Sequence, residues 1–226
     1  MKESICFGLN AEGIIPGKLQ LSKRAKSIYN NKIENEPTEV KRTRLLTAYA
    51  YAVSETNASG GEIVTAPTCG SCGVLPATLY YLQKEDKYTD EEIINALATA
   101  GIIGNIVKTN ASISGAECGC QAEIGTACSM AAAACSQLRK LDIYKIEHAA
   151  EIAMEHHLGL TCDPIYGYVQ IPCIERNAVA AIRAIDASNI SMLLDENQKI
   201  SFDLITETMY ETGKDLRSHY RETSTG

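Results

Sequence analysis

Apolar residues recur at helical spacing along most of the chain. Between Thr89 and Lys108 they fall at positions 93, 94, 97, 98, 102 and 106, which is the spacing of one buried helix face. Thr89, followed three residues later by Glu92, forms a capping-box pattern where this helix begins. Comparable patterns predict five more helices, over residues 37–59, 121–141, 146–159, 173–188 and 202–220.

Residues at the ends of these segments support the helical assignment. Ser201 is suited to cap the last predicted helix, and Pro37 is expected near the first turn of the first one. Gly159 is expected to end the helix over 146–159. The Ala-rich segment 121–141 is apolar on most sides and therefore predicts a buried helix.

Strand signals are few. Residues 61–67 and 167–172 are short extended stretches, and we interpret both as connecting segments. Residues 8–22 resemble a loop without a helix of their own. The pattern thus predicts an all-α fold, a compact helical domain with active-site loops rich in Gly, Ser and Cys.

Composition narrows the function classes. The chain has 226 residues, 45% hydrophobic and 22% charged, as in ordinary soluble globular proteins. It contains no apolar run of about 18 residues, so no membrane span is predicted. A net charge of −7 argues against a nucleic-acid partner, which favours basic surfaces. No signal peptide is recognised at the N-terminus, so we expect a cytoplasmic protein.

Nine cysteines are a high count for such a chain. Disulfides rarely persist in a reducing cytoplasm, which leaves metal ligation, redox chemistry or simple burial. Several cysteines fall in three loop segments, residues 65–77, 109–125 and 159–177, which lie between the apolar helices. Loops of this kind often carry function.

Cys120, Cys162 and Cys173 are the candidate metal ligands. Cys120 precedes the Ala-rich helix and Cys173 begins the helix over 173–188. The partial positive charge of a helix N-terminus stabilises a thiolate. Cys162 precedes a turn-forming Asp-Pro pair. Three buried structural cysteines are the alternative, because no compact ligand motif links them.

The remaining cysteines have simpler interpretations. Cys69 and Cys72 form a C-x-x-C pair, which suggests zinc or thiol–disulfide chemistry or two incidental cysteines in a Gly-rich loop. Cys128 and Cys135 share a helix face, which favours burial as small apolar residues.

His156 and His157 lie near the end of a predicted helix, shortly before Cys162. A histidine in the last turn often serves as a partner of the helix dipole. A general base or proton shuttle is the alternative.

Five segments resemble the catalytic α region of the iron–sulfur-dependent L-serine dehydratases (L-serine ammonia-lyases): GLNAEGIIPG, GEIVTAPTCGSCGVLPA, NASISGAECGCQAEIG, EHHLGLTCDPIYGYVQIPCIERNA and ETGKDLRSHYRETSTG. The resemblance covers essentially the whole chain. It implies a [4Fe–4S] cluster held by three thiolates in the motifs G-C-Q-x-E-x-G, G-L-x-C-D-P and P-C-x-x-R-N. These motifs fall on Cys120, Cys162 and Cys173, and they favour Cys120 over Cys118.

The resemblance also implies the reaction. Three thiolates leave one iron of the cluster open as a Lewis acid for the hydroxyl of L-serine. A base removes the α-proton, and dehydration followed by hydrolysis gives pyruvate and ammonia, a step of amino-acid catabolism and gluconeogenesis that needs no pyridoxal phosphate. Ser71, Ser112 and Ser114 are candidates for holding the substrate carboxylate. The general base is not identified; His156 is a candidate and a β-domain residue is the alternative.

Two family features do not occur in these residues. One is the Ser-Ser-Ser-His-Thr-x-Gly-Pro segment of the β domain, and the other is a Gly-Leu-Ala tail that ends in a cysteine. We therefore expect residues 1–226 to form a single catalytic α domain that works with a β domain or β subunit, as a homodimer or heteromer. The alternatives are a non-catalytic helical metal-binding or scaffold subunit with structural cysteines, and a zinc-dependent protein that uses Cys69 and Cys72.

Overall fold

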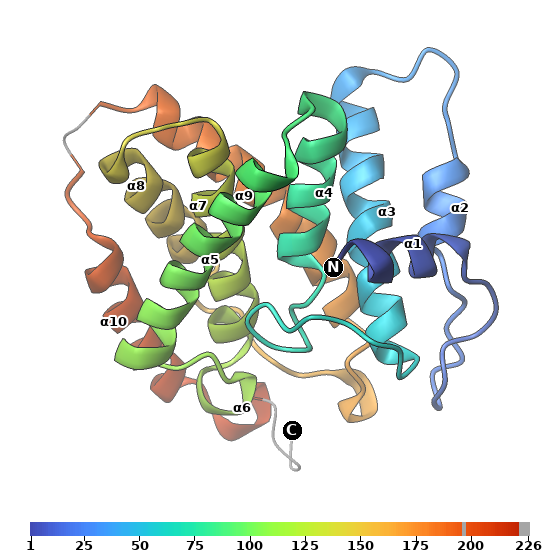
Figure 1. Cartoon of the computed structure of the whole chain (residues 1–226). Helices are drawn as coiled ribbons and strands as arrows, with labels where there is room; N and C mark the ends of the chain where they lie inside the picture. The colour runs from blue at the N-terminus through green and yellow to red at the C-terminus, as the bar shows by residue number, and fades with distance from the viewer. Residues whose placement is uncertain (196–197, 222–226) are drawn as a thin grey trace.

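A computed structural model of the chain describes residues 1–195 and 198–221, and helices dominate it (Figure 1). Within these residues no strand is formed, and β pairing is limited to an isolated bridge between Ile14 and Ser22. The predicted all-α fold is confirmed. The α-helices are α1 Lys2–Asn10, α2 Ala25–Asn30, α3 Thr38–Ala58, α4 Val74–Asp86, α5 Asp90–Asn110, α6 Gly115–Cys118, α7 Thr126–Leu138, α8 Ile143–Glu155, α9 Cys173–Leu193 and α10 Phe202–Asp215.

α7 lies at the centre of the fold, where it packs against α4, α5, α8 and α9. All of its residues except Gln137 are buried, which confirms the buried helix predicted from the Ala-rich sequence. The α-helix starts later than the predicted residue 121, because residues Gln121–Gly125 form a π-helical turn ahead of α7. α3 organises the other part of the core and packs against α1, α2, α4 and α9.

The predicted N-terminal caps of two helices are formed. The Glu92 backbone N–H donates to Thr89 Oγ1 at 3.2 Å, and the Thr89 N–H donates to Glu92 Oε2 at 2.9 Å. Ser201 Oγ accepts from the Leu204 N–H at 3.2 Å. Pro37 is the residue directly before α3 and so lies next to its first turn, as expected.

Several helix ends differ from the prediction, and the differences at α8, α9 and α10 are the largest. α8 ends at Glu155 and not at Gly159, whose φ of +78° serves a later turn. The Gly159 N–H donates to a side chain from another part of the chain, which draws the segment away from the helix axis. α9 continues to Leu193, five residues beyond the predicted 188, and α10 ends at Asp215.

Four helices in the described residues were not predicted: α1, α2, α4 and α6. α1 covers Lys2–Asn10 and overlaps the start of the segment interpreted as a loop. α4 begins at Val74, inside the predicted loop 65–77, with Pro76 in its first turn. Proline is tolerated there because the first N–H groups of a helix have no intrahelical acceptor. The connecting segments 61–67 and 167–172 contain no strand, as expected.

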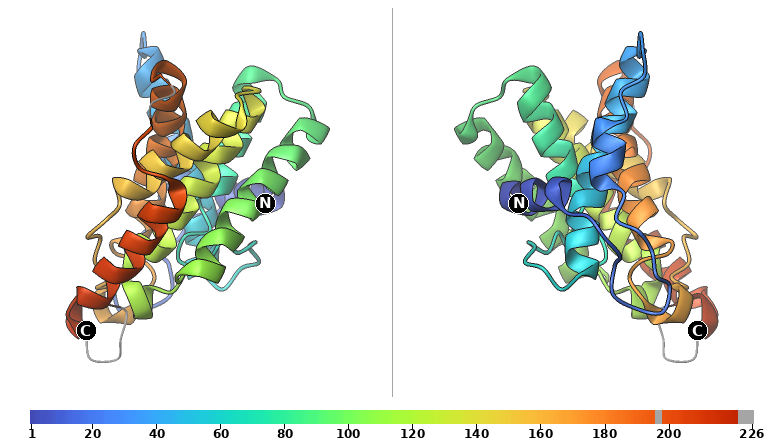
Figure 2. Two further views of the ribbon diagram at one scale, coloured as in Figure 1. Left: turned by 90° about the vertical axis from the view of Figure 1, so that its left-hand side faces the viewer. Right: turned by 90° about the vertical axis from the view of Figure 1, so that its right-hand side faces the viewer.

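The three loop segments gather at one end of the helices, at the lower side of Figures 1 and 2. Asn177 of α9 joins two of them. Its Oδ1 accepts from the Gly73 N–H at 2.8 Å, while its Nδ2 donates to the Gly70 carbonyl at 2.8 Å. None of the helices in the described ranges is both long and apolar enough to cross a membrane.

Candidate metal centre

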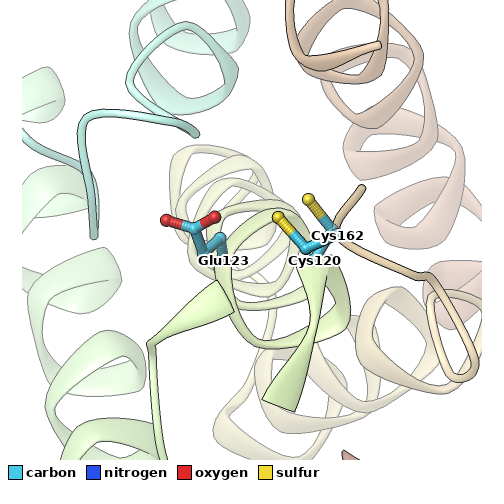
Figure 3. Close-up of side chains that lie close together, drawn as sticks. All are labelled: Cys120, Glu123 and Cys162. Carbon is cyan, nitrogen blue, oxygen red and sulfur yellow. The ribbon is translucent and has the colours of Figure 1, made fainter. Parts of the chain in front are cut away.

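Cys120, Glu123 and Cys162 bring three potential ligand atoms together. Their two thiol sulfurs and one carboxylate oxygen all lie within 4.8 Å of one another (Figure 3). Cys120 precedes the π-helical turn, which carries Glu123, and Cys162 lies in the loop after α8. Both cysteines are buried, each with 2% exposure. The predicted neighbours Cys120 and Cys162 are therefore adjacent in space.

Gln121 holds the two cysteine-bearing segments side by side. Its buried side chain accepts a hydrogen bond from the Gly159 N–H at 2.8 Å and donates one to the Met209 carbonyl at 2.8 Å. Its backbone N–H donates to the Leu160 carbonyl at 3.1 Å. These bonds fix the loop after α8 against the π-helical turn and, through Met209, against α10.

Gly119 permits this close approach of the two segments. Its φ of +74° lies in the region that favours glycine. A Cβ atom at this position would lie 2.9 Å from the Leu160 carbonyl oxygen and 2.7 Å from a methyl carbon of Leu216. A larger residue would therefore push the two cysteines apart.

The surroundings of Cys120 favour its thiolate form. The hydrogen bond from Cys162 is the main cause that lowers the pKa of Cys120, and the positive charge of Arg176 contributes in the same direction, against the effect of burial. Arg176 is itself held in place, because it donates to the Thr161 carbonyl at 2.6 Å and lies 3.8 Å from the Asp163 carboxylate.

Cys173 is the first residue of α9 and is also buried. Among the described residues, the group within 4.8 Å contains Glu123 and not the Cys173 sulfur. The first turn of α9 nevertheless adjoins this group, since it carries Arg176, whose charge acts on Cys120. Asn177 Nδ2 also donates to the Cys173 carbonyl at 2.9 Å.

Sequence reasoning did not assign a role to Glu123 or Arg176. Glu123 lies three residues after Cys120 in the motif G-C-Q-x-E-x-G, and Arg176 lies three after Cys173 in P-C-x-x-R-N. This spacing places both residues about one helical turn from a candidate ligand, which is the signal that could have found them. The Glu123 carboxylate also contacts the 65–77 loop: a Cβ atom on Gly70 would lie 3.3 Å from each of its oxygens.

The three candidate serines occupy different environments. Ser71 is fully buried, and its hydroxyl lies 3.1 Å from Thr68 Oγ1 and 3.4 Å from the Ala66 carbonyl within the same loop. Ser112 is buried and its Oγ accepts from the Ser114 N–H at 3.1 Å. Ser114 is exposed.

His156 follows the last residue of α8, and its Nδ1 lies 2.9 Å from the Ile152 carbonyl. A proton on Nδ1 is donated there, which leaves Nε2 as the basic atom. His156 lines a groove of about 370 Å³ together with Arg176 and Arg183. Burial lowers the pKa of the neighbouring His157 to about 4, so this second histidine is neutral at physiological pH.

The other cysteines have separate environments. Cys118 is buried against α10, where a Cβ on Gly213 would lie 2.8 Å from its sulfur, and burial raises its pKa to about 11. Cys128 and Cys135 are fully buried, as predicted. Cys69 is exposed, whereas Cys72 is buried with a pKa raised to about 12. Within the described part of the chain, this pair belongs to no group of three ligand atoms.

Comparison with known proteins identifies the family of this chain. Residues 1–226 match the family described as "Serine dehydratase alpha chain". The chain is similar to L-serine dehydratases from Haemophilus influenzae, with 49% identity, from Escherichia coli (L-serine dehydratase 1), with 46%, and from Streptomyces coelicolor, with 45%. Each match covers all of this chain, which spans about half the length of the relatives (50%, 51% and 50%). The chain therefore belongs to the serine dehydratase alpha chain family.

Proposed function

We propose that residues 1–226 form the catalytic α domain of an L-serine dehydratase, which converts L-serine to pyruvate and ammonia. The observation that carries this proposal is the buried pair of Cys120 and Cys162, with Arg176 beside it. Family membership over the full chain and the names of the relatives support the same activity.

The ligands proposed for a [4Fe–4S] cluster are Cys120, Cys162 and Cys173. Their chemistry fits, because iron–sulfur clusters are held by cysteine thiolates in buried sites. The lowered pKa of Cys120 and the position of Cys173 at the start of α9 both favour thiolates. When bound, such a cluster supplies an open iron that acts as a Lewis acid.

The substrate carboxylate is proposed to bind at the loops that carry Ser71, Ser112 and Ser114. Ser112 Oγ accepts the Ser114 N–H, so the Ser112 hydroxyl proton remains available for donation. Ser71 has its hydroxyl bonded inside its own loop, and its part is to keep that loop in shape. Arg176 adds a positive charge at the same end of the helices.

His156 is proposed to take the α-proton of L-serine at its Nε2 atom. Loss of this proton and of the hydroxyl group as water gives aminoacrylate. Its imine tautomer then takes up water and releases ammonia to leave pyruvate. A base from the β region of the enzyme is the alternative, because the chain spans about half the length of its relatives.

The first test is iron binding by cysteine variants. Cys120→Ser, Cys162→Ser and Cys173→Ser are reconstituted anaerobically with iron and sulfide, and iron and sulfide per chain are counted. We expect each variant to lose most of its iron, while Cys69→Ser and Cys118→Ser keep that of the parent chain. Full iron content in all three ligand variants would contradict the assignment. If the parent chain is colourless and binds zinc through Cys69 and Cys72, the alternative of a zinc-dependent protein is supported instead.

The second test is turnover with and without a β region. We expect the chain alone to fold but to form little pyruvate, because a missing wall of the site misplaces reacting groups, and an error of about 1 Å can cost roughly a hundredfold in rate. Pyruvate formation is measured before and after addition of the β region of a relative. Full activity of the chain by itself would show that the α domain builds the whole site.

A further inference from the structure

The group formed by Cys120, Glu123 and Cys162 has the dimensions of a site for one metal ion. Its three ligand atoms all lie within 4.8 Å of one another. Two thiolates on one tetrahedral zinc ion, each about 2.3 Å from the metal, lie roughly 3.8 Å apart. Shifts of at most about 1 Å are therefore enough to place all three atoms on a single ion. Figure 3 shows the two sulfurs side by side, with one Glu123 oxygen turned toward them.

This compact arrangement differs from the one that an iron–sulfur cluster requires. In a four-iron cube each thiolate binds a different iron, so its sulfurs lie farther apart than two sulfurs on one ion. Cys120 and Cys162 are instead close enough for a hydrogen bond between their side chains. Cys173, proposed as the third cluster ligand, belongs to no group of three ligand atoms among the described residues. The ligand set that the fold brings together is two thiols and a carboxylate.

The donor atoms of this set suit zinc. Thiolates select soft divalent ions, zinc among them, over magnesium or calcium, and zinc accepts both sulfur and carboxylate oxygen as ligands. Both cysteines are 2% exposed, and ionised groups in a buried position require a compensating charge. Zn²⁺ neutralises two of the three negative charges, and Arg176, whose positive charge acts on Cys120, offsets part of the third.

The backbone around the three ligands is already fixed, which lowers the cost of binding an ion. The Gln121 N–H donates to the Leu160 carbonyl at 3.1 Å, and the Cys162 N–H donates to the Tyr220 carbonyl at 2.7 Å. Glu123 lies in the π-helical turn directly after Cys120. Small side-chain rotations are therefore the main change that metal binding requires.

From this geometry we infer that the cluster-free chain binds one zinc ion through Cys120, Glu123 and Cys162, with a water molecule as the fourth ligand. Three protein ligands and one water are typical of zinc sites that keep an open position. This binding is independent of the proposed function. Its consequence rests on that function: the ion takes two of the three thiolates proposed for the cluster, so zinc and the cluster exclude each other.

The test is anaerobic titration of the metal-free 226-residue chain with Co²⁺, followed by displacement with Zn²⁺. Sulfur-to-cobalt charge-transfer absorption reports thiolate ligation, and we expect one ion per chain. Cys120→Ser, Cys162→Ser and Glu123→Gln should each raise the Kd for zinc at least about tenfold, because loss of even a group that only orients a ligand costs about 10–100-fold. Cys173→Ser and Cys69→Ser are the matched controls and should bind zinc as the parent chain does. Circular dichroism verifies that each variant is folded.

Reconstitution with iron and sulfide measures the consequence for the cluster. We expect the parent chain to lose most of its iron uptake when one equivalent of zinc is added first. Glu123→Gln, which holds zinc more weakly, should keep more of its iron under the same conditions. Unchanged iron uptake by the zinc-loaded parent chain would overturn the mutual exclusion.

The ligand set itself is overturned by two other results. One is full zinc binding in Glu123→Gln together with loss of binding in Cys173→Ser or Cys69→Ser, which would place the ion on other residues. The other is a parent chain that gives no sulfur-to-cobalt band. The proposed function fails separately: a parent chain that binds zinc through these three residues but assembles no cluster upholds the zinc site and contradicts the proposed function.

Discussion

Asn177 is the residue through which the 65–77 loop is joined to α9, and its replacement by alanine tests that connection. The side chain is 1% exposed and makes three hydrogen bonds, to the Gly73 N–H, the Gly70 carbonyl and the Cys173 carbonyl. Asn177→Ala removes all three at once, without introducing a charge or a larger group.

The cost follows from what each partner loses. The Gly73 N–H lies in a buried loop, and leaving it without an acceptor costs about 1–3 kcal/mol. The bond to the partly buried Gly70 carbonyl contributes about 1 kcal/mol. The Cys173 carbonyl begins α9, where the helix supplies it with another donor. We therefore expect Asn177→Ala to lower the free energy of unfolding by about 3 kcal/mol.

Urea unfolding monitored by circular dichroism measures this change. A loss of about 3 kcal/mol corresponds to a decrease in Tm of roughly 6–12 °C for a chain of this size. Asn105→Ala is the control, because Asn105 is exposed on α5 and alanine there is a better helix former. Iron per chain, counted after anaerobic reconstitution, should also decrease in Asn177→Ala, because Cys173 is in the same network.

Two results would refute this reasoning. If Asn177→Ala unfolds within about 0.5 kcal/mol of the parent chain, the buried Gly73 N–H has found another partner. If the stability decreases as expected but iron binding does not, the network supports the fold without positioning the proposed ligands.

Three further predictions concern helices away from the proposed metal site. A Cβ atom on Gly101 would have nothing within 4 Å, so Gly101→Ala should stabilise the protein through α5 by about 0.5–1 kcal/mol. A Cβ atom on Gly8 would lie 2.2 Å from a backbone oxygen of α3, so Gly8→Ala should destabilise the protein by about 1–3 kcal/mol. Urea unfolding measures both changes. Thr89→Ala removes the capping box and should cost about 1 kcal/mol in the same assay, with unchanged iron binding; an unchanged urea midpoint would show that the cap is dispensable. Burial, with the hydrogen bond and charge of Glu155, raises the pKa of Glu151 from 4.5 to about 8. Its contribution to stability is therefore complete below about pH 4.5 and is lost as the pH rises through about 8. Glu151→Gln should unfold at a higher urea concentration than the parent chain at pH 9, and an equal or lower midpoint would contradict the raised pKa.

The sequence by itself determined the helical class and several helix starts. Thr89 and Glu92 are three residues apart, so their reciprocal bonds depend on local geometry alone, and the predicted cap is present. The Ala-rich composition of α7 likewise specified a helix that is buried on nearly all sides. Motif resemblance selected Cys120 and Cys162, which the fold brings together.

Tertiary structure decided the features that depend on contacts between distant segments. Gly159 was expected to end α8, but its N–H bonds to Gln121, and the helix ends earlier. Gly8 and Gly101 both lie inside helices, yet only the surrounding packing shows that one touches α3 and the other faces open space. Helix propensities and caps act over about one turn, whereas these contacts, and the approach of Glu123 to the two thiols, exist only once the helices have packed.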